Sequence, residues 1–328
     1  MTTDPTRDYI LHRLLSLSED NYENIALDVY RYQYQHCHVY RTWCDALSLK
    51  TPETIEDIPY LPISAYKYHE VITGKWTPEA RFQSSGTTSD NRSQHLIRDL
   101  SYYTEHCVDH IPAYLPMSSD TRLYALLPSY QEQSQSSLLH MVDAMGERCD
   151  FQGYYGTRLE DLYADIISDL ESGKTIWLIG VSYALLDLAD LGKIEAQIHV
   201  TYTGGMKGRG RELTHTELTH SLLRAWPEAI LTVEYGMTEL LSQAWARLDG
   251  WLTPGPAMKL SLAVTDNPMR QTQGTRGIAR ITDLYNVDSC AFIVTEDLAE
   301  LRADGSFKIL GRLDYSDLRG CNLMYVSS

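Results

Sequence analysis

Short apolar segments alternate with amphipathic segments from Arg122 to about residue 248, and this alternation restricts the fold more than any other feature of the sequence. TIWLIG, AQIHVTYTGG and AILTVEYG have the length and apolar content of buried strands. SYALLDLADL, between the first two, and TELLSQAWARL, after the third, carry apolar residues at helical spacing. This order predicts an α/β fold with a doubly wound, mostly parallel sheet and helices on both faces. In such sheets ligands bind at the carboxyl ends of the strands.

Helix start signals support this assignment. Asp99 is a candidate N-cap for a helix that begins at the next residue. Thr157-x-x-Glu160 and Thr214-x-x-Glu217 have the spacing of capping boxes, in which two side chains satisfy free backbone N–H groups at a helix start. Each of the three predicts the first turn of a helix.

The two ends of the chain differ from this central pattern. Residues 6 to 48 are predicted to form two helices, and IPYLPISAYK, interrupted by proline, is predicted to be extended. Beyond about residue 250, MKLSLAVTD, TRGIARITDL, CAFIVT, LAELRADG and FKILGRLD are predicted strands without helices between them, with a hairpin turn at Asp304-Gly305. We therefore expect a single domain of 328 residues with a helical segment (1–75), an α/β core (76–250), a smaller β-rich subdomain (251–313) and a tail (314–328).

Composition excludes several classes of partner. The net charge of −16 argues against a nucleic-acid partner, which needs an excess of Lys and Arg on one face. The sequence begins without a signal-like apolar stretch, and no apolar run is long enough to span a bilayer, so we expect a cytoplasmic protein. The six cysteines lack paired spacing and are expected to be free thiols.

Three polar loops follow or adjoin the predicted strands. The first, Ser84 to Ser89, places hydroxyl side chains around one glycine, which suits a phosphate clamp, although a polar surface loop has the same composition. The second, TGGMKGRGRE, brings paired glycines and positive charge to the sheet edge. In the third, EYGMTE, Tyr235 offers a stacking face, Thr238 a hydroxyl and Glu239 an oxygen ligand for Mg²⁺. Their convergence predicts a ligand site.

GVSYA, from Gly180 to Ala184, nearly matches the nucleophile elbow of α/β-hydrolases. A hydrolase of that kind needs a later acid and histidine, but the last histidine is His220. We interpret Ser182 as the first residue of a core helix. Similarly, His36, Cys37, His38 and Cys44 could suggest zinc, but a helix would point these neighbours to different faces, and we expect no metal site there.

SSGTT, YGMTE and GRLD, in this order, resemble the phosphate loop, the adenine and magnesium segment and the hinge of the adenylate-forming superfamily, which includes acyl-CoA synthetases, luciferases and adenylation domains. The sequence resembles the LuxE-type acyl-protein synthetases more closely. That resemblance rests on PYLPISAYK, FQSSGTTS, LLPSY with SSLLHM, LIGVSYALLDLA, TGGMKGRGRE, EYGMTELLSQAWA and GRLDYSDLRGCNL, which extend from about residue 58 to the end.

The resemblance implies a set of site residues. Those that would bind ATP are Ser84, Ser85, Gly86, Thr87, Thr88, Gly204, Gly205, Tyr235, Asp297 and Arg312. Those that would act in catalysis are Thr88, Thr238, Glu239 and Cys321. Glu239 would bind Mg²⁺, and Asp297, in TED where the superfamily has TGD, would bond the ribose hydroxyls with support from Arg312. Cys321 matches the cysteine that LuxE-type proteins acylate.

Two features depart from the superfamily pattern. Ser89 stands where the phosphate loop usually has glycine, and the loop has no lysine, so Arg92 or His95 would supply the positive charge. Asp314 falls at the hinge position and only 14 residues follow it, so we expect the mobile C-terminal lid to be absent, with the tail in its place.

The resemblance implies an ATP- and Mg²⁺-dependent ligase that activates a carboxylic acid, in particular a fatty acid, as an acyl-adenylate. The acyl group would pass to a thiol, in particular Cys321, for delivery to a partner such as an acyl reductase. Coenzyme A or a carrier protein is the alternative acceptor. A degenerate adenylate fold that binds an acyl group or a partner without turnover is a further alternative.

Overall fold

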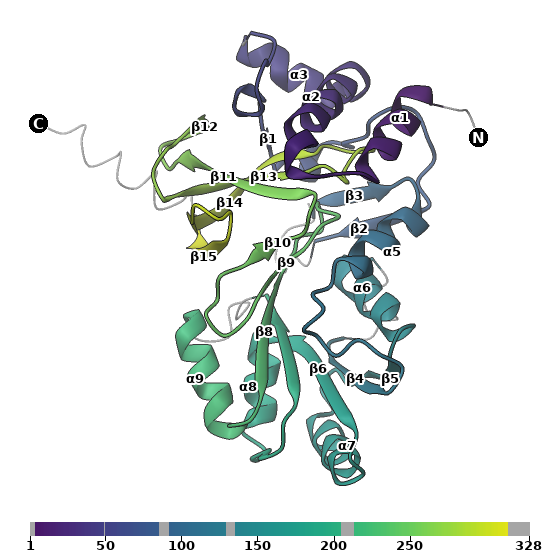
Figure 1. The fold of residues 1–328 in the computed structure, drawn as a ribbon, viewed down its shortest axis with the longest axis vertical. Helices are drawn as coiled ribbons and strands as arrows, with labels where there is room; N and C mark the ends of the chain where they lie inside the picture. The colour runs from purple at the N-terminus through teal and green to yellow at the C-terminus, as the bar shows by residue number, and fades with distance from the viewer. Residues whose placement is uncertain (1–3, 49, 85–91, 129–134, 205–212, 314–328) are drawn as a thin grey trace, which may run out of the picture. The chain divides into compact units, whose positions relative to one another are not determined.

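The computed structural model describes residues 4–48, 50–84, 92–128, 135–204 and 213–313 (Figure 1). The chain divides into two compact units. One unit is continuous and contains residues 76–255. The other combines residues 1–75 with residues 256–328, so the helical N-terminal segment and the β-rich segment belong to the same unit. The expectation that the whole chain acts as one domain stays a prediction.

The continuous unit is built on a seven-stranded sheet with the order β10-β9-β8-β7-β6-β4-β5. Its strands are β4 (Thr121–Leu126), β5 (Asp150–Tyr154), β6 (Thr175–Val181), β7 (His199–Thr203), β8 (Ile230–Tyr235), β9 (Ala244–Ala246) and β10 (Thr253–Pro254). Strands β5, β4, β6, β7 and β8 pair in parallel with their neighbours in the sheet. Strand β9 pairs antiparallel with β8 and with β10. The predicted α/β fold with a mostly parallel, doubly wound sheet is confirmed.

Helices cover both faces of this sheet. They are α5 (Leu100–Asp109), α6 (Ser137–Gly146), α7 (Leu159–Glu171), α8 (Ser182–Ala189) and α9 (His215–Ala225). On one face, Tyr124 of β4 donates to Asp169 of α7, and Tyr202 of β7 bonds His215 of α9. On the opposite face, Tyr154 of β5 donates to Asp143 of α6. Successive residues of a strand point to opposite faces, so α7 to α9 lie on one face, and α6 and its neighbour α5 lie on the other.

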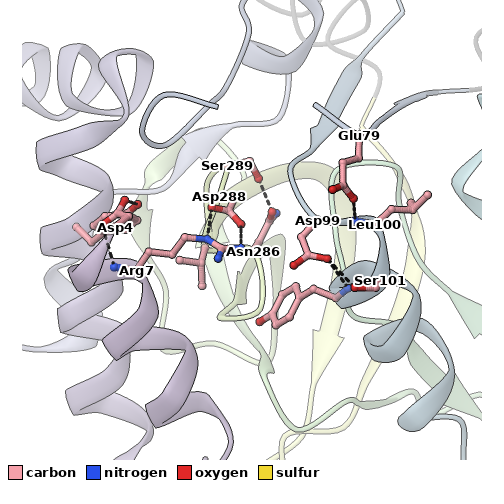
Figure 2. A network of polar contacts seen from close by, with 12 residues as sticks. Asp4, Arg7, Glu79, Asp99, Leu100, Ser101, Asn286, Asp288 and Ser289 are labelled. Atoms are coloured by element: carbon pink, nitrogen blue, oxygen red, sulfur yellow. Dashed lines mark hydrogen bonds and ion pairs between the residues drawn. The ribbon is translucent and has the colours of Figure 1, made fainter. Parts of the chain in front are cut away.

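Two of the three predicted helix starts are correct. The Asp99 carboxylate accepts from the Tyr102 N–H at 3.0 Å, and Figure 2 shows it at the start of α5. The capping box of α9 is complete, because Thr214 and Glu217 each accept from the other's backbone N–H. The box at Thr157 is wrong, since α7 has Arg158 at its N-cap position and no side-chain cap.

TELLSQAWARL, predicted as a helix, is instead a turn followed by β9. Tyr235 of β8 pairs with Ala244, and Glu234 pairs with Trp245. All three residues of β9 are buried, and β10 pairs along its other edge. A segment without a polar face is compatible with a central strand as well as with a buried helix. Here it forms a strand because it pairs with the edge of β8.

A small hairpin precedes α5. Strands β2 (Ala80–Gln83) and β3 (Gln94–Ile97) pair antiparallel as a separate two-stranded sheet. Phe82 of β2 is buried and packs against the rings of Tyr103 and His140, which belong to α5 and α6. The hairpin is thereby fixed to the α5 and α6 face of the continuous unit.

The second unit contains a six-stranded sheet. Its strands are β1 (Leu61–Pro62), β11 (Met258–Val264), β12 (Asn267–Gln271), β13 (Arg276–Asp283), β14 (Phe292–Leu301) and β15 (Phe307–Arg312). CAFIVT and LAELRADG, predicted as two strands, form the single strand β14. The hairpin turn at Asp304-Gly305 is confirmed, because it joins β14 to β15 and Gly305 has a φ of 83°. The β-rich character predicted beyond residue 250 is also confirmed.

The N-terminal part of this unit has three long helices where two were predicted. These are α1 (Pro5–Leu14), α2 (Glu19–His36) and α3 (His38–Leu47), followed by the short helices η1 (Ile55–Asp57) and α4 (Ala65–Tyr68). The extra boundary is Cys37, whose extended backbone separates α2 from α3. IPYLPISAYK is extended only up to β1, and α4 begins within it.

Arg7 of α1 is buried and holds the helix to the segment between β13 and β14. Its Nε and one terminal nitrogen donate to the two carboxylate oxygens of Asp288, each at 2.7 Å (Figure 2). In the same segment, Ser289 donates to the Asn286 side chain. Gln33 of α2 donates to the carbonyl of Asn286 at 2.8 Å. Polar contacts therefore attach both helices to one buried turn.

Two further expectations concern described residues. Cys37, Cys44, Cys107, Cys149 and Cys290 are free thiols, as predicted. Among the residues that the structure describes, no helix is long and apolar enough to cross a membrane.

Candidate active site

The carboxyl ends of β6, β7 and β8 meet at one edge of the seven-stranded sheet, where a ligand site was predicted. Gly204 follows β7 with a φ of 67°, and a Cβ added to it would meet no atom of the described residues within 4 Å. Tyr235 ends β8 and is half-buried. Gly204 therefore combines a left-handed backbone with open space, as expected where a ligand approaches the main chain.

Ser182 lies at the same edge, at the start of α8. Its hydroxyl donates to the Gly204 carbonyl at 2.7 Å, and its side chain is buried. The hydroxyl thus links α8 to the loop after β7. This contact agrees with the interpretation of Ser182 as the first residue of a core helix.

The turn after β8 carries Thr238 and Glu239. Glu239 is only 4% exposed, and the carbonyl of Thr238 accepts a hydrogen bond from Nδ1 of His95 at 2.8 Å. His95 belongs to β3 and is itself buried. The contact brings the β2–β3 hairpin against the EYGMTE segment, although the two are 143 residues apart in the chain.

Ser84 closes the base of the hairpin loop. Its backbone N–H donates to the Ser93 carbonyl, and its hydroxyl accepts from the Ser93 N–H, both at 3.1 Å. The Gln83 N–H donates to the carbonyl of Gln135, which precedes α6. Ser84, the first residue of the segment predicted to clamp phosphates, is therefore bonded to Ser93, directly before the strand that contains His95.

Glu234 is a buried carboxyl group at this edge that the sequence interpretation did not single out. Its Oε2 accepts a hydrogen bond from Thr203, the residue opposite it on β7. Burial raises the pKa of Glu234 to about 7, and the Thr203 bond only partly opposes this. A charged residue in the otherwise apolar segment AILTVEYG was the signal available in the sequence.

Gly236 packs against this carboxyl group. A Cβ on Gly236 would lie 2.5 Å from Oε1 of Glu234. Any larger residue would force the carboxyl group out of its position. The glycine of the EYGMTE segment therefore serves close packing against Glu234 as well as the turn.

Asp297 and Arg312 lie in the other unit, where they are opposite one another on β14 and β15. The Asp297 N–H donates to Thr295 at 3.0 Å, and the Arg312 guanidinium donates to Glu296 at 3.0 Å. The two predicted site residues are therefore brought together. The arginine is mostly exposed and forms its ion pair with Glu296.

Several predicted site residues lie outside the described residues. They are Ser85, Gly86, Thr87, Thr88, Ser89, Gly205 and Cys321. The basic residues of TGGMKGRGRE, which are Lys207, Arg209 and Arg211, lie outside them too, as does Asp314.

Glu239 was predicted to bind Mg²⁺. Proteins commonly hold this ion through one or two carboxylates together with substrate phosphates. No group of three or more metal-ligating side chains occurs among the residues that the structure describes. A single buried carboxylate next to the Thr238 hydroxyl is compatible with a metal that is shared with a nucleotide.

A protein-family model matches the N-terminal part of the chain. Residues 5–104 match the model of the family described as acyl-protein synthetase, LuxE. A long-chain-fatty-acid–luciferin-component ligase of Photorhabdus luminescens is 37% identical over 67 residues, which are 20% of this chain and 58% of that protein. The resemblance to the LuxE-type proteins is thus confirmed, and the motifs beyond residue 104 lie outside the family match.

Solved structures show the same fold. A 2-hydroxyisobutyryl-CoA ligase in the postadenylation state, in complex with R3-HIB-AMP, has a TM-score of 0.60 at 14% identity and matches 89% of this chain and 68% of its own. ATP-bound MatB from Rhodopseudomonas palustris has a TM-score of 0.51 at 17% identity and matches 71% of this chain and 48% of its own. The fold is that of the large domain of adenylate-forming enzymes. The chain spans about half the length of MatB.

Proposed function

We propose that this protein is an AMP-forming ligase that uses ATP to activate a carboxylic acid. A carboxylate oxygen of the acid attacks the α-phosphorus of ATP, the bond between the α- and β-phosphates breaks, and acyl-adenylate and pyrophosphate are formed. The contact between His95 and Thr238 carries this proposal. It joins the hairpin of the phosphate-loop motif to the EYGMTE segment, so that two motifs of the same reaction adjoin one nucleotide.

Each group at the strand edge has a role in this reaction. Thr87, Thr88 and Ser84 bond the phosphates, while Tyr235 and the glycines Gly204 and Gly205 enclose the adenine. Glu239 holds Mg²⁺, which when bound neutralises negative charge on the phosphates. The main requirement for such a transfer is a set of hydrogen-bond donors and charges that are already in position. These stabilise the negative charge that develops on the phosphate oxygens without having to reorganise during the reaction. For the ribose hydroxyls, the resemblance to the adenylate-forming superfamily is the support for assigning Asp297, with Arg312 beside it.

The second step is transfer of the acyl group to Cys321. The thiolate attacks the carbonyl carbon of the adenylate, a thioester forms, and AMP leaves with the bonding electron pair. The resemblance to the LuxE-type proteins supports this step. Burial raises the pKa of the Cys37, Cys44, Cys149 and Cys290 thiols, which disfavours the thiolate at those positions.

The acid is a fatty acid, and the acyl group is delivered to a partner such as an acyl reductase. An apolar substrate is supported by buried apolar residues, which are Leu240 and Leu241 in the turn after β8 and Met141 on α6. Transfer to coenzyme A or to a carrier protein is the alternative second step. It would make AMP release depend on the added thiol acceptor.

Exchange of labelled pyrophosphate into ATP tests the first step. Wild-type protein should catalyse exchange with a fatty acid, and Glu239→Gln should lower the rate at least about 100-fold, because charge stabilisation at the phosphates is lost. Glu228→Gln, the same exchange at an exposed position, is the control. If folded wild-type protein catalyses no pyrophosphate exchange with any carboxylic acid, the chain is a binding module without turnover.

Labelling with ATP and a radioactive fatty acid tests the second step. Wild-type protein should retain label that hydroxylamine removes, and Cys321→Ser should not. Cys149→Ser, which replaces a half-buried thiol, should label like the wild type. Equal labelling of Cys321→Ser and wild type would exclude the thioester at Cys321.

A further inference from the structure

Ser182 carries a buried hydroxyl group to which the proposed function gives no role. It is the first residue of α8, and a serine hydroxyl at a helix start commonly accepts a hydrogen bond from a backbone N–H of the first turn. Within the described chain, α8 has no side-chain cap, and Ser182 donates to the Gly204 carbonyl at 2.7 Å. The hydroxyl therefore serves the end of β7 rather than its own helix.

The parallel register of β6 and β7 places Ser182 beside Gly204. Val181 ends β6 and is opposite Thr203, which ends β7, so the two residues that follow are neighbours as well. At this point β6 continues into α8, whereas the sequence after β7 is rich in glycine. The start of a helix thus adjoins a glycine that is assigned to the adenine.

Close packing holds the donor in place. A Cβ added to Gly180, near the end of β6, would lie 3.0 Å from Cγ and Cδ2 of Leu185, so glycine allows α8 to lie this close to the sheet without a clash. Leu185 is fully buried, and Ser182 is only 4% exposed. The hydroxyl of Ser182 therefore projects from a tightly packed helix start.

The acceptor belongs to a residue with a permissive backbone. Gly204 has a φ of 67°, and a Cβ on it would meet no described atom within 4 Å. Glycine populates positive and negative φ about equally, so a glycine in open space depends on hydrogen bonds to keep one conformation. The Ser182 hydroxyl supplies such a bond. Main chain that is already ordered loses less entropy when a ligand binds.

We infer that Ser182 is a positioning residue for nucleotide binding, because its hydroxyl holds the main chain at Gly204 in the conformation that receives the adenine. This inference rests on the proposed function. Ser182 acts through Gly204, and no bond forms or breaks at its oxygen. The near match of GVSYA to a nucleophile elbow then has a structural explanation, in which the serine is a hydrogen-bond donor to the neighbouring strand end.

ATP binding by the full chain tests the inference. Calorimetry with ATP and Mg²⁺ gives Kd without an acid, and pyrophosphate exchange gives kcat and the KM values for ATP and for a fatty acid. Loss of one neutral hydrogen bond changes an equilibrium constant by about 3- to 10-fold, so Ser182→Ala should raise Kd and KM for ATP by this factor. Both kcat and the KM for the acid should change by less than about 2-fold, because the lost contact supports the ground state and the transition state equally.

Three further variants separate positioning from loss of packing. Ser182→Thr keeps the hydroxyl and should bind ATP within about 2-fold of the wild type. Ser182→Cys keeps the side-chain volume but is a weak donor, so it should lose affinity, and it replaces Ser182→Ala if that variant does not fold. Thr219→Val is the matched control, since it removes a buried hydroxyl that bonds the carbonyls of His215 and Thr216 within α9. It should lower the melting temperature and leave the affinity for ATP unchanged.

The outcomes distinguish the positioning role from the proposed reaction. An unchanged Kd for ATP in Ser182→Ala overturns the inference, as does a lower kcat at unchanged KM or an equal loss of affinity in Thr219→Val. If Ser182→Ala alone binds ATP more weakly but wild-type protein catalyses no exchange with any carboxylic acid, the proposed reaction fails and the positioning role stands. Wild-type protein that does not bind ATP would contradict both.

Discussion

Nδ1 of His95 donates a hydrogen bond to the carbonyl oxygen of Thr238 at 2.8 Å. A carbonyl oxygen can only accept, so this nitrogen carries a proton whatever the charge of the ring. Thr238 belongs to the EYGMTE segment, and His95 follows the candidate phosphate loop and is buried. His95 is therefore a positioning residue for the turn that contains Glu239.

Replacement of His95 should separate positioning from simple loss of packing. His95→Ala leaves the Thr238 carbonyl without this donor, which should cost about 1–3 kcal/mol of unfolding free energy. It should also lower pyrophosphate exchange by up to about 100-fold, because a small displacement of reacting groups is sufficient for that loss. His95→Asn places an N–H near the position of Nδ1 and should recover part of the rate. Equal rates for the two variants would contradict the positioning role.

Two glycines at the same sheet edge should respond differently to alanine. In Gly236→Ala the new Cβ would meet the Glu234 carboxyl group, and we expect a destabilisation of about 1–3 kcal/mol. In Gly204→Ala the Cβ enters open space, so only the strain of a positive φ remains, about 1 kcal/mol. Adding Glu234→Ala to Gly236→Ala should relieve the clash. Unfolding free energies in urea give the coupling, and strict additivity would mean that the two residues do not touch.

Glu234 should make stability depend on pH. Its pKa is 4.5 in the unfolded chain and about 7 in the folded protein, so the folded state holds more protons between these values. Wild-type stability should therefore fall as pH rises from about 4.5 to about 7. Glu234→Gln lacks this loss, and its advantage over wild type should be near zero at pH 4 and about 3 kcal/mol at pH 8. Glu228→Gln controls for the side-chain exchange; an advantage of Glu234→Gln that does not change with pH would refute the assignment.

The ion pair between Arg7 and Asp288 should stabilise the unit that contains the N-terminal helices. Asp288→Asn leaves a buried guanidinium without its charge partner, and we expect a loss of about 3 kcal/mol. The double variant Arg7→Met with Asp288→Asn removes the uncompensated charge and should recover much of this loss. Arg31→Met, at an exposed ion pair on α2, should cost less than about 1 kcal/mol. Urea titrations of the full chain provide the comparison.

The sequence was sufficient to predict those elements whose signals are local. Alternating apolar and amphipathic segments predicted the parallel sheet, and Thr214 with Glu217 predicted the start of α9 correctly. Apart from the capping box at Thr157, errors arose where a distant segment determines the outcome. Trp245 lies in a strand because it pairs with Glu234 of β8, and the apolar pattern around it is equally compatible with a helix. The break at Cys37 carries neither glycine nor proline, so no local signal indicated it.

The residues of the candidate site divide in the same way into those that a local motif predicts and those that depend on distant contacts. Tyr235 and Glu239 were predicted because they belong to one short motif directly after a strand. The bond between Thr203 and Glu234 joins residues 31 positions apart, and it depends on the register of β7 against β8. Register is set by packing of whole strands, which no local pattern encodes. The same holds for His95, whose partner Thr238 becomes a neighbour only when the hairpin packs against the sheet unit.

Strand β14 pairs with β13 along one edge, while β1 and β15 share its other edge. Strand β15 pairs with the C-terminal half of β14, from Asp297 to Leu301, and the turn at residues 302–306 connects β14 to β15. A protease cut in that turn followed by loss of β15 would expose a row of unpaired backbone groups next to Asp297. Exposed edges of this kind recruit strands from other molecules. Limited proteolysis of this protein should therefore produce self-association together with any loss of nucleotide binding.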